Sequence, residues 1–483
     1  MVPLAWDELF PVGSLPEKRL RLRAITIGQA MSERPGAAMT EAFDDWKDTR
    51  TAYNFFENEK MSLPVLLDPA TRALGRALQE LPEGTTVLSV QDTTELNLSH
   101  LPSMTGLGEI GNPKNRGLMA HAGLAVGTDG VPLGLLGTQT WVRPIGGVDG
   151  GGNRRSKRAA KARRSKPFDE KESVRWWTMI EEVEQRVGRP GLLLHVGDRE
   201  NDIYDVFSRS EQAHYRLLVR AAQDRNVAGE HGSLWAQVES FDESEQRQVI
   251  EVPERPAKDG KPARAARDAT LAIRFGAVTL CAPKKAPGSV EMWAVLVREV
   301  DPPAGEEAIE WLLLTLDPIK TVEDAWLRVE WYRFRWRIEE FFKVLKTGCL
   351  VEKRQFESRE TFEVSLGFSL LTAARLLALT KRARHEPDAP ASEALSPDEE
   401  HILIQHAEVH RGRTPSPLRL AEAVMLIAML GGYKGRSCDG PPGWITLWRG
   451  YRRLCAMVDG YRLARPNPLE SATPASEVHP NTD

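Results

Sequence analysis

The spacing of apolar positions changes along the chain and divides it into helical and strand-rich parts. Residues 17–36, EKRLRLRAITIGQAMSERPG, place apolar side chains at helical intervals and end at a Pro-Gly pair. Residues 1–65 are therefore expected to form a small helical domain. From about residue 84 the pattern turns to alternating and continuous apolar runs, which predict strands with some helices between them.

Two aspartates follow predicted strands. GTTVLSVQDTTELNLS is interpreted as a strand that ends at Asp92, followed by a second strand, and GLLLHVGDREND as a buried strand with Asp198 at its carboxyl end. A hairpin that turns at Asp129-Gly130 and a helix at 171–187 lie between them. Carboxylates at strand ends are typical of α/β active sites, although a single aspartate more often caps a helix.

The predicted core carries an insertion. Residues from about 225 to 316 have the pattern of strands and separate Asp198 from the next strongly patterned helix. They are interpreted as a β-rich insertion within an α/β catalytic domain of residues 66–385.

The C-terminal part is expected to be helical. A linker rich in Pro, Ala and acids occupies residues 386–399. Helical spacing returns in a domain of residues 400–464, near whose start the apolar stretch LRLAEAVMLIAMLGG is expected to supply a dimer face. The polar tail at 465–483 has the composition of a disordered segment.

The stretch WYRFRWRIEEFFKVLKTG, residues 331–348, is predicted to form one helix, because no Pro or Gly interrupts it before Gly348. At 100° per residue, four polar residues fall within about 60° of one another, beside an apolar face: Tyr332, Arg335, Glu339 and Lys346. Glu340 lies about 100° further round the helix than Glu339. An ordinary surface ion pair between Arg335 and Glu339 is the alternative interpretation.

The composition indicates a soluble globular protein. The distribution of charge along the chain indicates that it contacts a polyanion. The hydrophobic fraction is 41% and the charged fraction 27%, and no apolar run reaches the roughly 20 residues of a membrane span. The four cysteines have no CxxC spacing, so neither a disulfide framework nor a zinc site is expected. The net charge is −4, yet residues 154–166 hold eight Lys or Arg and no acid, which favours contact with nucleic acid.

Asp92, Asp198 and Glu339 are the candidate catalytic residues. Three converging carboxylates suit Mg²⁺, which takes oxygen ligands and keeps open water positions. Two such ions about 4 Å apart activate an attacking oxygen and stabilise the leaving oxygen in phosphodiester cleavage. Arg335 and Lys346, in the same stripe as Glu339, would then hold the phosphate backbone. Two Mg²⁺ ions are the expected cofactors, and Mn²⁺ is expected to substitute for them.

These residues carry a resemblance that covers nearly the whole chain. The pattern Y-x2-R-x3-E-x6-K at 332–346, with QDTTELNLS around Asp92 and GDREND around Asp198, resembles the DDE transposases of the IS-four family, of the Tn-five-like cut-and-paste type. The resemblance implies an RNase H-like catalytic core with a β-rich insertion, flanked by an N-terminal domain that recognises transposon ends and a C-terminal dimerisation region. It also implies that Asp92, Asp198 and Glu339 form a metal-binding triad.

The resemblance further implies DNA contacts. Three residues of the stripe are expected at the DNA end near the cut: Tyr332, Arg335 and Lys346. Arg220 in LLVRAA matches a DNA-contacting arginine of the family. Trp311 matches a tryptophan that stacks on a flipped base, with a core position as the open alternative, and Trp336, outside the apolar face, is a further candidate. Asn54 departs from the pattern, because the family usually has an arginine there.

The expected function is a DNA transposase that acts as a homodimer on double-stranded DNA, in the cytoplasm at the bacterial nucleoid, with no membrane partner. The resemblance implies water attack that frees a 3′-OH, attack of this hydroxyl on the opposite strand to give a hairpin, and later transfer to target DNA. Two alternatives remain open. One is an RNase H-like nuclease that only hydrolyses, and the other is a catalytically silent, transposase-derived DNA-binding regulator.

Overall fold

The computed structural model describes residues 6–464 except 44, 113, 146–164, 253, 255–262, 284–287, 413–415, 437–438 and 441. Most of the chain up to Lys381 forms one compact unit, and residues 33–35 with the chain from Arg382 onward form a second. The basic stretch at 154–166, apart from its last two residues, and the tail at 465–483 lie outside the described residues.

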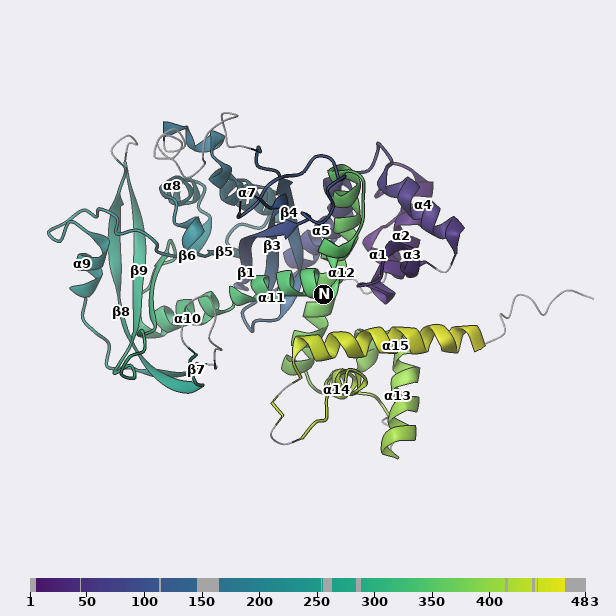
Figure 1. Cartoon of the computed structure of the whole chain (residues 1–483). Coiled ribbons are helices and arrows are strands. Elements are labelled where there is room, and N and C mark those ends of the chain that lie inside the picture. The colour runs from purple at the N-terminus through teal and green to yellow at the C-terminus, as the bar shows by residue number, and fades with distance from the viewer. Residues whose placement is uncertain are drawn as a thin grey trace, which may run out of the picture. The chain divides into compact units, whose positions relative to one another are not determined.

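Helices precede the sheet in the chain (Figure 1): α1 (Trp6–Leu9), α2 (Lys18–Glu33), α3 (Met39–Ala42), α4 (Trp46–Phe56) and α5 (Leu63–Gln79). α4 begins where the Asp45 side chain accepts a hydrogen bond from the backbone N–H of Asp48 at 2.6 Å, which satisfies one of the free donors at a helix start. The ring of Phe55 lies 5.9 Å from that of Phe368 in the long helix α12 (Arg359–His385). α4 therefore packs within the unit that holds the sheet.

A mixed sheet of ten strands forms the centre of this unit. Its first part has the spatial order β4-β3-β1-β5-β6, with α7 and α8 before and after β5: β1 (Val87–Asn97), β3 (Arg116–Gly127), β4 (Pro132–Trp141), α7 (Arg175–Val187), β5 (Leu193–Gly197), α8 (Tyr204–Gln212) and β6 (Arg216–Arg220). β5 is parallel to both β1 and β6, whereas β3 is antiparallel to both β1 and β4. The short β2 (Gly108–Glu109) pairs with the start of β3. The chain thus has the predicted mixed α/β fold with helical regions before and after the strands.

The expected end of a strand at Asp92 is wrong. β1 runs through Asp92 to Asn97, because its antiparallel ladder with β3 continues to the pair of Asn97 and Gly117. Side chains alternate along a strand, so Asp92 faces one side of the sheet and Gln91 and Thr93 face the other.

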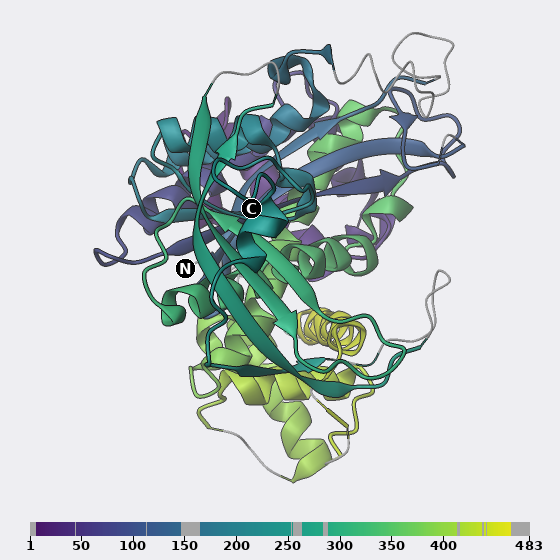
Figure 2. The ribbon, with the colours of Figure 1, turned by 90° about the vertical axis from the view of Figure 1, so that its left-hand side faces the viewer.

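The residues between about 225 and 316 extend this sheet and do not form a separate one. They contribute α9 (Leu234–Glu239), β7 (Gln248–Val252), β8 (Arg267–Cys281), β9 (Ser289–Glu299) and β10 (Glu310–Thr315). β10 is antiparallel to β6, and the order then continues through β9 and β8 to β7. Figures 1 and 2 show the long β8 and β9 at this end of the sheet.

Helices pack against both faces around β1. On the face of Gln91 and Thr93, α5 and α7 bury an apolar cluster with the strands, which includes Leu74, Leu78, Val87, Leu136, Val183 and Val187. Gly123 and Gly137 allow α7 this approach, since a Cβ added there would lie 3.3 or 3.1 Å from the Met179 sulfur. On the other face, toward which Asp92 points, α11 (Trp336–Lys343) lies against β1 and β3.

The prediction of one continuous helix over 331–348 is wrong. α10 (Val322–Arg333) ends before Phe334, α11 begins at Trp336, and the final turn, Val344–Gly348, is a π-helix. Between α10 and α11 the backbone N–H groups of Phe334 and Arg335 donate to carbonyls three residues earlier, so the chain tightens there. The stripe predicted from a regular α-helix is therefore distributed over three segments.

The second unit is helical, as expected for this part of the chain: α13 (Pro397–Arg411), α14 (Leu420–Leu430) and α15 (Trp444–Ala464). Ser396 and Glu399 form a capping box at the start of α13, and the Tyr451 hydroxyl of α15 donates to Glu399 at 2.9 Å. α14 and α15 cross closely at Gly431 and Gly450, where an added Cβ would collide with backbone oxygens of the facing helix.

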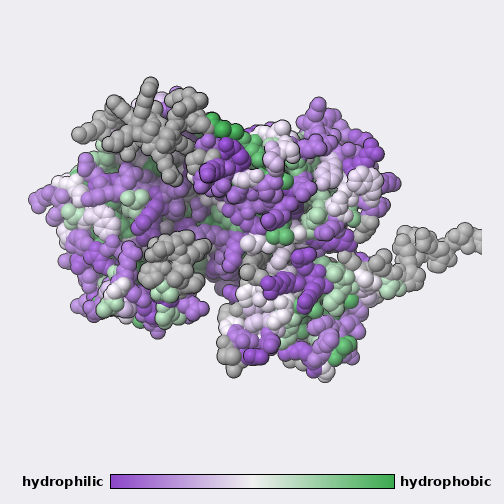
Figure 3. Space-filling model, in the orientation of Figure 1, coloured by the Kyte–Doolittle hydropathy of each residue, from purple (hydrophilic) through white to green (hydrophobic). Residues whose placement is uncertain are grey.

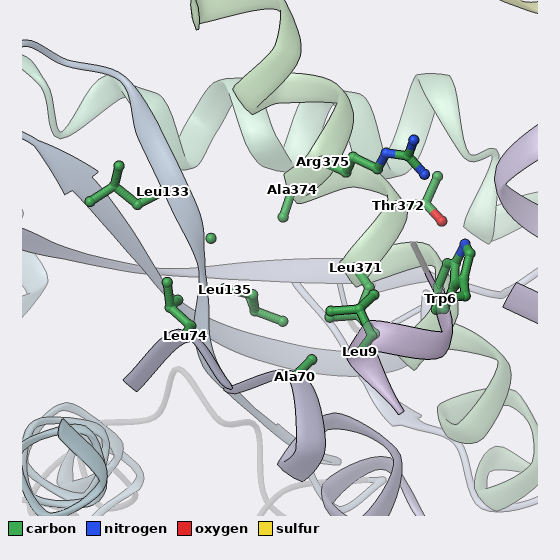
Figure 4. A pocket seen from close by; sticks show the side chains of 11 residues that line it. Trp6, Leu9, Ala70, Leu74, Leu133, Leu135, Leu371, Thr372, Ala374 and Arg375 are labelled. Atoms are coloured by element: carbon green, nitrogen blue, oxygen red, sulfur yellow. The ribbon is translucent and has the colours of Figure 1, made fainter. Parts of the chain in front are cut away.

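α12 is long and apolar enough to cross a membrane by length and composition, but 78% of its apolar window is buried inside the protein. It is thus buried as a core helix is. An apolar pocket lies beside it, lined by residues of α1, α5, β4 and α12 (Figure 4). Its lining contains no acidic residue, and Arg375 is the charged member. The pocket is therefore better explained as a gap between packed elements than as a catalytic site.

A buried cluster of charged side chains connects β6, the end of β10 and α10. Asp317, just after β10, is 6% exposed. Its carboxylate accepts hydrogen bonds from Nε and Nη2 of Arg216 in β6, the shortest from each nitrogen at 3.0 and 2.6 Å, and lies 3.2 Å from a guanidinium nitrogen of Arg328 in α10. One carboxylate thus serves two cations from two elements.

Asp317→Asn should lower the free energy of unfolding by about 3–5 kcal/mol, because it leaves two partly buried guanidinium groups without an anion. Chemical denaturation measures this change. The matched control is Asp68→Asn, which breaks the exposed pair with Arg72 at 2.7 Å and should cost no more than about 0.5 kcal/mol. Equal effects of the two substitutions would contradict the assignment.

Candidate active site

Asp92 and Asp198 lie side by side because β1 and β5 run in parallel. The register pairs Val90 with Val196, and each aspartate follows two residues later. Both side chains therefore leave neighbouring strands on the same face of the sheet. The pairing brings together two of the three predicted catalytic residues.

Each aspartate is held by a backbone N–H of the residues that follow it. Oδ1 of Asp92 accepts from the N–H of Thr93 at 2.7 Å, and Oδ1 of Asp198 accepts from the N–H of Glu200 at 2.8 Å. The second bond caps the short 3₁₀ turn Arg199–Asn201. Asp198 thus has the capping role that the sequence left open and still faces Asp92.

Arg335 connects Asp92 with Glu339. One guanidinium nitrogen donates to Glu339 Oε1 at 2.7 Å, and the other lies 3.4 Å from Asp92 Oδ2. The Arg335 side chain is 10% exposed, and those of Asp92 and Glu339 are 16% and 37% exposed. Arg335 and Glu339 form the expected ion pair. The pair is partly buried, and Arg335 also contacts Asp92.

Burial and neighbouring charge act together on Asp92. The pKa of the Asp92 carboxyl is raised from 3.8 to about 7, chiefly because burial removes water and also because of the charges of Asp198 and Glu339. The Thr93 hydrogen bond and the Arg335 charge partly oppose this rise. A carboxyl so perturbed beside two other carboxylates marks a candidate functional site. It also marks a place where added positive charge would be stabilised.

The three carboxylates have the chemistry of a divalent-cation site, but not its geometry. Asp92, Asp198 and Glu339 offer the carboxylate oxygens that Mg²⁺ prefers, so the chemistry of the donors fits. Among the described residues, however, no three Asp, Glu, His or Cys lie close enough to hold an ion as they stand. Arg335 lies between Asp92 and Glu339 and acts as their counter-ion. An ion shared by the triad therefore requires the Arg335 guanidinium to move aside.

Tyr332, Arg220 and Trp311, from α10, β6 and β10, lie close to one another, and Tyr332 interacts with the charges of Arg335 and Asp198. The ring centroids of Trp311 and Tyr332 are 6.1 Å apart, and Arg220 donates to the carbonyl of Glu310 at 2.8 Å. Burial raises the pKa of the Tyr332 hydroxyl, against the charges of Arg335 and Arg220. Trp311 is partly exposed, so it does not occupy the fully buried core position that was the alternative for it.

The two remaining sequence candidates lie nearer to solvent. Trp336 is 56% exposed, and the Arg335 guanidinium lies 5.3 Å from its ring centroid. Lys346 is partly exposed in the π-helical turn, and its ammonium forms none of the ion pairs found among the described residues. The face of the protein shown in Figure 3 is mainly hydrophilic.

Glu340 has different partners from Glu339. Its carboxylate pairs with Arg337 at 2.9 Å and with Lys381 of α12 at 2.6 Å. Glu340 therefore pairs with an arginine of its own helix and with a lysine that α12 supplies.

The sequence missed Arg175, at the start of α7. Its side chain is 11% exposed, and its guanidinium lies 5.4 Å from the ring centroid of Trp141. It donates to the Thr93 hydroxyl at 3.0 Å and to Glu200 at 2.7 Å. In the sequence it was one basic residue in a predicted helix, with no spacing that related it to the aspartates.

Asp92→Asn should stabilise the metal-free protein at pH 8 and leave it unchanged near pH 4. An acid whose pKa is higher in the folded than in the unfolded state loses folding stability as pH rises between the two values, here from 3.8 to about 7. At about 1.4 kcal/mol per pH unit the gain is at most about 4 kcal/mol. Urea unfolding at both pH values measures it, and a gain independent of pH would refute the assignment.

Two parts of the chain match known protein families. Residues 8–61 match the family described as Transposase DNA-binding, and residues 371–470 match the Transposase Tn5 dimerisation domain. Asp92, Asp198 and Glu339 lie outside both matches. The chain is thus similar to Tn5-type transposases at its two ends, and these similarities support a DNA-binding protein of that type that forms a homodimer.

Proposed function

We propose that the protein is a DNA transposase that cuts and joins DNA through metal-dependent DDE chemistry. One observation carries this proposal: Asp92 and Asp198 leave adjacent parallel strands on one face, and Arg335 ties Asp92 to Glu339. In the sequence, the three carboxylates lie between the two segments that resemble transposase domains. In this proposal the protein is a DDE transposase of the IS-four family.

The strand arrangement supports an RNase H-like core. The first five long strands, taken in chain order as one to five, have the spatial order three-two-one-four-five, with the second antiparallel to its neighbours. RNase H-like sheets have this order and these directions. The strands from β7 to β10 would then be the insertion, attached through the edge of β6.

Asp92, Asp198 and Glu339 would hold Mg²⁺ or Mn²⁺, two ions in all. When bound, such ions activate an attacking oxygen and stabilise a leaving one. The three carboxylates provide the negative charge that binds them, and the raised pKa of Asp92 indicates how strongly the unliganded site resists that charge. Arg335 would move from the carboxylates to a phosphate group.

The side chains around the triad suit a DNA end. Nε of Arg335 is buried without a hydrogen-bond partner among the described residues, so it has a donor free for a phosphate oxygen. Arg220 and Lys346 add positive charge, and Tyr332 adds a hydroxyl. Trp311 and Trp336 are both accessible enough for a base to stack on their rings, an interaction worth about 1–3 kcal/mol per base.

The reaction sequence follows from the proposed class. Water attacks the phosphodiester and leaves a 3′-OH on the transposon end. That hydroxyl attacks the opposite strand, which closes a hairpin and releases the flanking DNA; hydrolysis reopens the hairpin, and the regenerated 3′-OH attacks target DNA. A strand-transfer assay with pre-cut ends separates this proposal from a nuclease that only hydrolyses, because only a transposase joins those ends to target DNA.

Glu339→Gln should abolish nicking of a labelled transposon end, with a loss on the order of 100-fold or more, because a carboxylate of the metal site is lost and small changes of geometry there cost about that much. Binding to the same end, measured by gel shift, should persist. Nicking by the unmodified protein in Mg²⁺, absent in EDTA, would exclude a catalytically silent regulator.

Glu340→Gln is the matched control. Glu340 is 39% exposed and pairs with Arg337 and Lys381, so its neutralisation should cost about 1 kcal/mol of stability at most and leave the rate within about tenfold. A dead Glu340→Gln enzyme beside an active Glu339→Gln enzyme would refute the proposed triad.

A further inference from the structure

A row of buried polar side chains runs behind the carboxylate site, on the α7 face of the sheet. It connects Arg175, at the start of α7, with Glu184 near the end of the same helix. Its members, in order of contact, are Arg175, Thr93, His121, Gln91, His195 and Glu184. We refer to it as the buried chain.

The contacts of the buried chain are short enough to form a connected network. Arg175 Nε lies 3.0 Å from the Thr93 hydroxyl, which lies 2.9 Å from His121 Nδ1. His121 Nε2 lies 3.3 Å from Gln91 Oε1, and Gln91 Nε2 lies 3.4 Å from His195 Nδ1. His195 Nε2 ends the row 3.0 Å from Glu184. His121 and His195 are 0% and 1% exposed, so water does not compete for these bonds.

The two ends of the buried chain determine its direction. A guanidinium only donates hydrogen bonds, and a carboxylate only accepts them. Burial lowers the pKa of His121 well below its usual range, so its imidazole is neutral and carries one N–H. Thr93 must then accept from Arg175 and donate to His121 Nδ1. His121, Gln91 and His195 likewise accept on one side and donate on the other, so both histidines carry a proton on Nε2, and Glu184 accepts the last bond.

Arg175 also connects the segments that hold the two aspartates. Its Nε donates to the side chain of Thr93, and its Nη2 donates to the side chain of Glu200. These are the two residues whose backbone N–H groups donate to Asp92 and Asp198. One guanidinium therefore sets the spacing between the two local structures that orient the carboxylates.

We propose that Arg175 is a positioning residue of the carboxylate site, oriented from behind by the buried chain that ends at Glu184. This inference rests on the proposed function for its effect on catalysis. Lysine is not expected to replace Arg175, because a single ammonium group lacks the planar fork that reaches Thr93 and Glu200 at once. All members of the buried chain lie on the α7 side of the sheet, opposite the side toward which Asp92 points.

Thr93→Val tests the proposal with a change of one atom, because it removes the hydroxyl that joins Arg175 to His121. We expect the nicking rate to fall roughly 10- to 100-fold, as when the groups that orient metal ligands are lost. The Mg²⁺ concentration for half-maximal rate should rise, while the affinity for a transposon end stays within about twofold. Arg175→Lys should have the same signature.

Ser89→Ala is the matched control. Ser89 lies on β1 on the same face as Thr93 and is paired in register with His195, but its buried hydroxyl has no hydrogen-bond partner among the described residues. Its removal should leave the rate and the Mg²⁺ requirement unchanged. Thermal melting of each variant identifies any loss of folding, and rates are compared below the melting transitions.

Imidazole nitrogen NMR tests the buried chain independently of activity. In the unmodified protein, His121 should show a protonated Nε2 and an unprotonated Nδ1 from about pH 5 to 8, and the neutral imidazole of His195 should be the same tautomer. A charged imidazole at His121, or an Nδ1–H tautomer of either histidine, would overturn the direction of the buried chain. If the unmodified protein cuts no DNA, the proposed function fails, but the NMR measurement still tests the direction of the hydrogen bonds in the buried chain. If it cuts and Thr93→Val behaves as Ser89→Ala does, the positioning role is refuted.

Discussion

Parallel pairing of β1 with β5 is the constraint on which the site depends. It brings Asp92 and Asp198, distant in the sequence, to neighbouring positions on one face of the sheet, where their carboxylates repel each other. Burial strengthens that repulsion, because charges interact more strongly where water is excluded. The pKa of Asp92 is raised first by burial itself and then by the charge of Asp198, and the charge of Arg335 partly offsets this rise.

Cations act on the aspartates from both faces of the sheet. Arg335 approaches from α11 and contacts Asp92 directly, whereas Arg175 approaches from α7 and acts through Thr93 and Glu200. The two arginines differ in what holds them. Arg335 depends on the carboxylates themselves and is therefore the one that a metal ion or a phosphate would displace. Arg175 is anchored to residues outside the triad and would stay in place.

α7 has two structural roles that its amphipathic pattern combines. Its apolar side fills the core, with Met179 packed close to Gly123 and Gly137, while Arg175 and Glu184 start and end a polar network within that core. Buried polar networks stabilise a fold only when each member has a partner. The alternation of acceptors and donors along the buried chain meets this requirement without a charged histidine.

The sequence by itself predicted the classes of element and distinguished Glu339 from Glu340, because these depend on local spacing along strands and helices. It placed the hairpin near Asp129-Gly130 and the helix at 171–187 for the same reason. It also nominated Asp92, Asp198 and Glu339, whose catalytic role stays a proposal. Tertiary structure alone decided the rest. The long ladder with β3 carries β1 past Asp92, the tightened turn before Trp336 divides the predicted helix, and β10 joins the insertion to β6. It also decided the importance of Arg175, because a guanidinium that bridges two strand ends depends on contacts between residues far apart in the chain, which no local periodicity encodes.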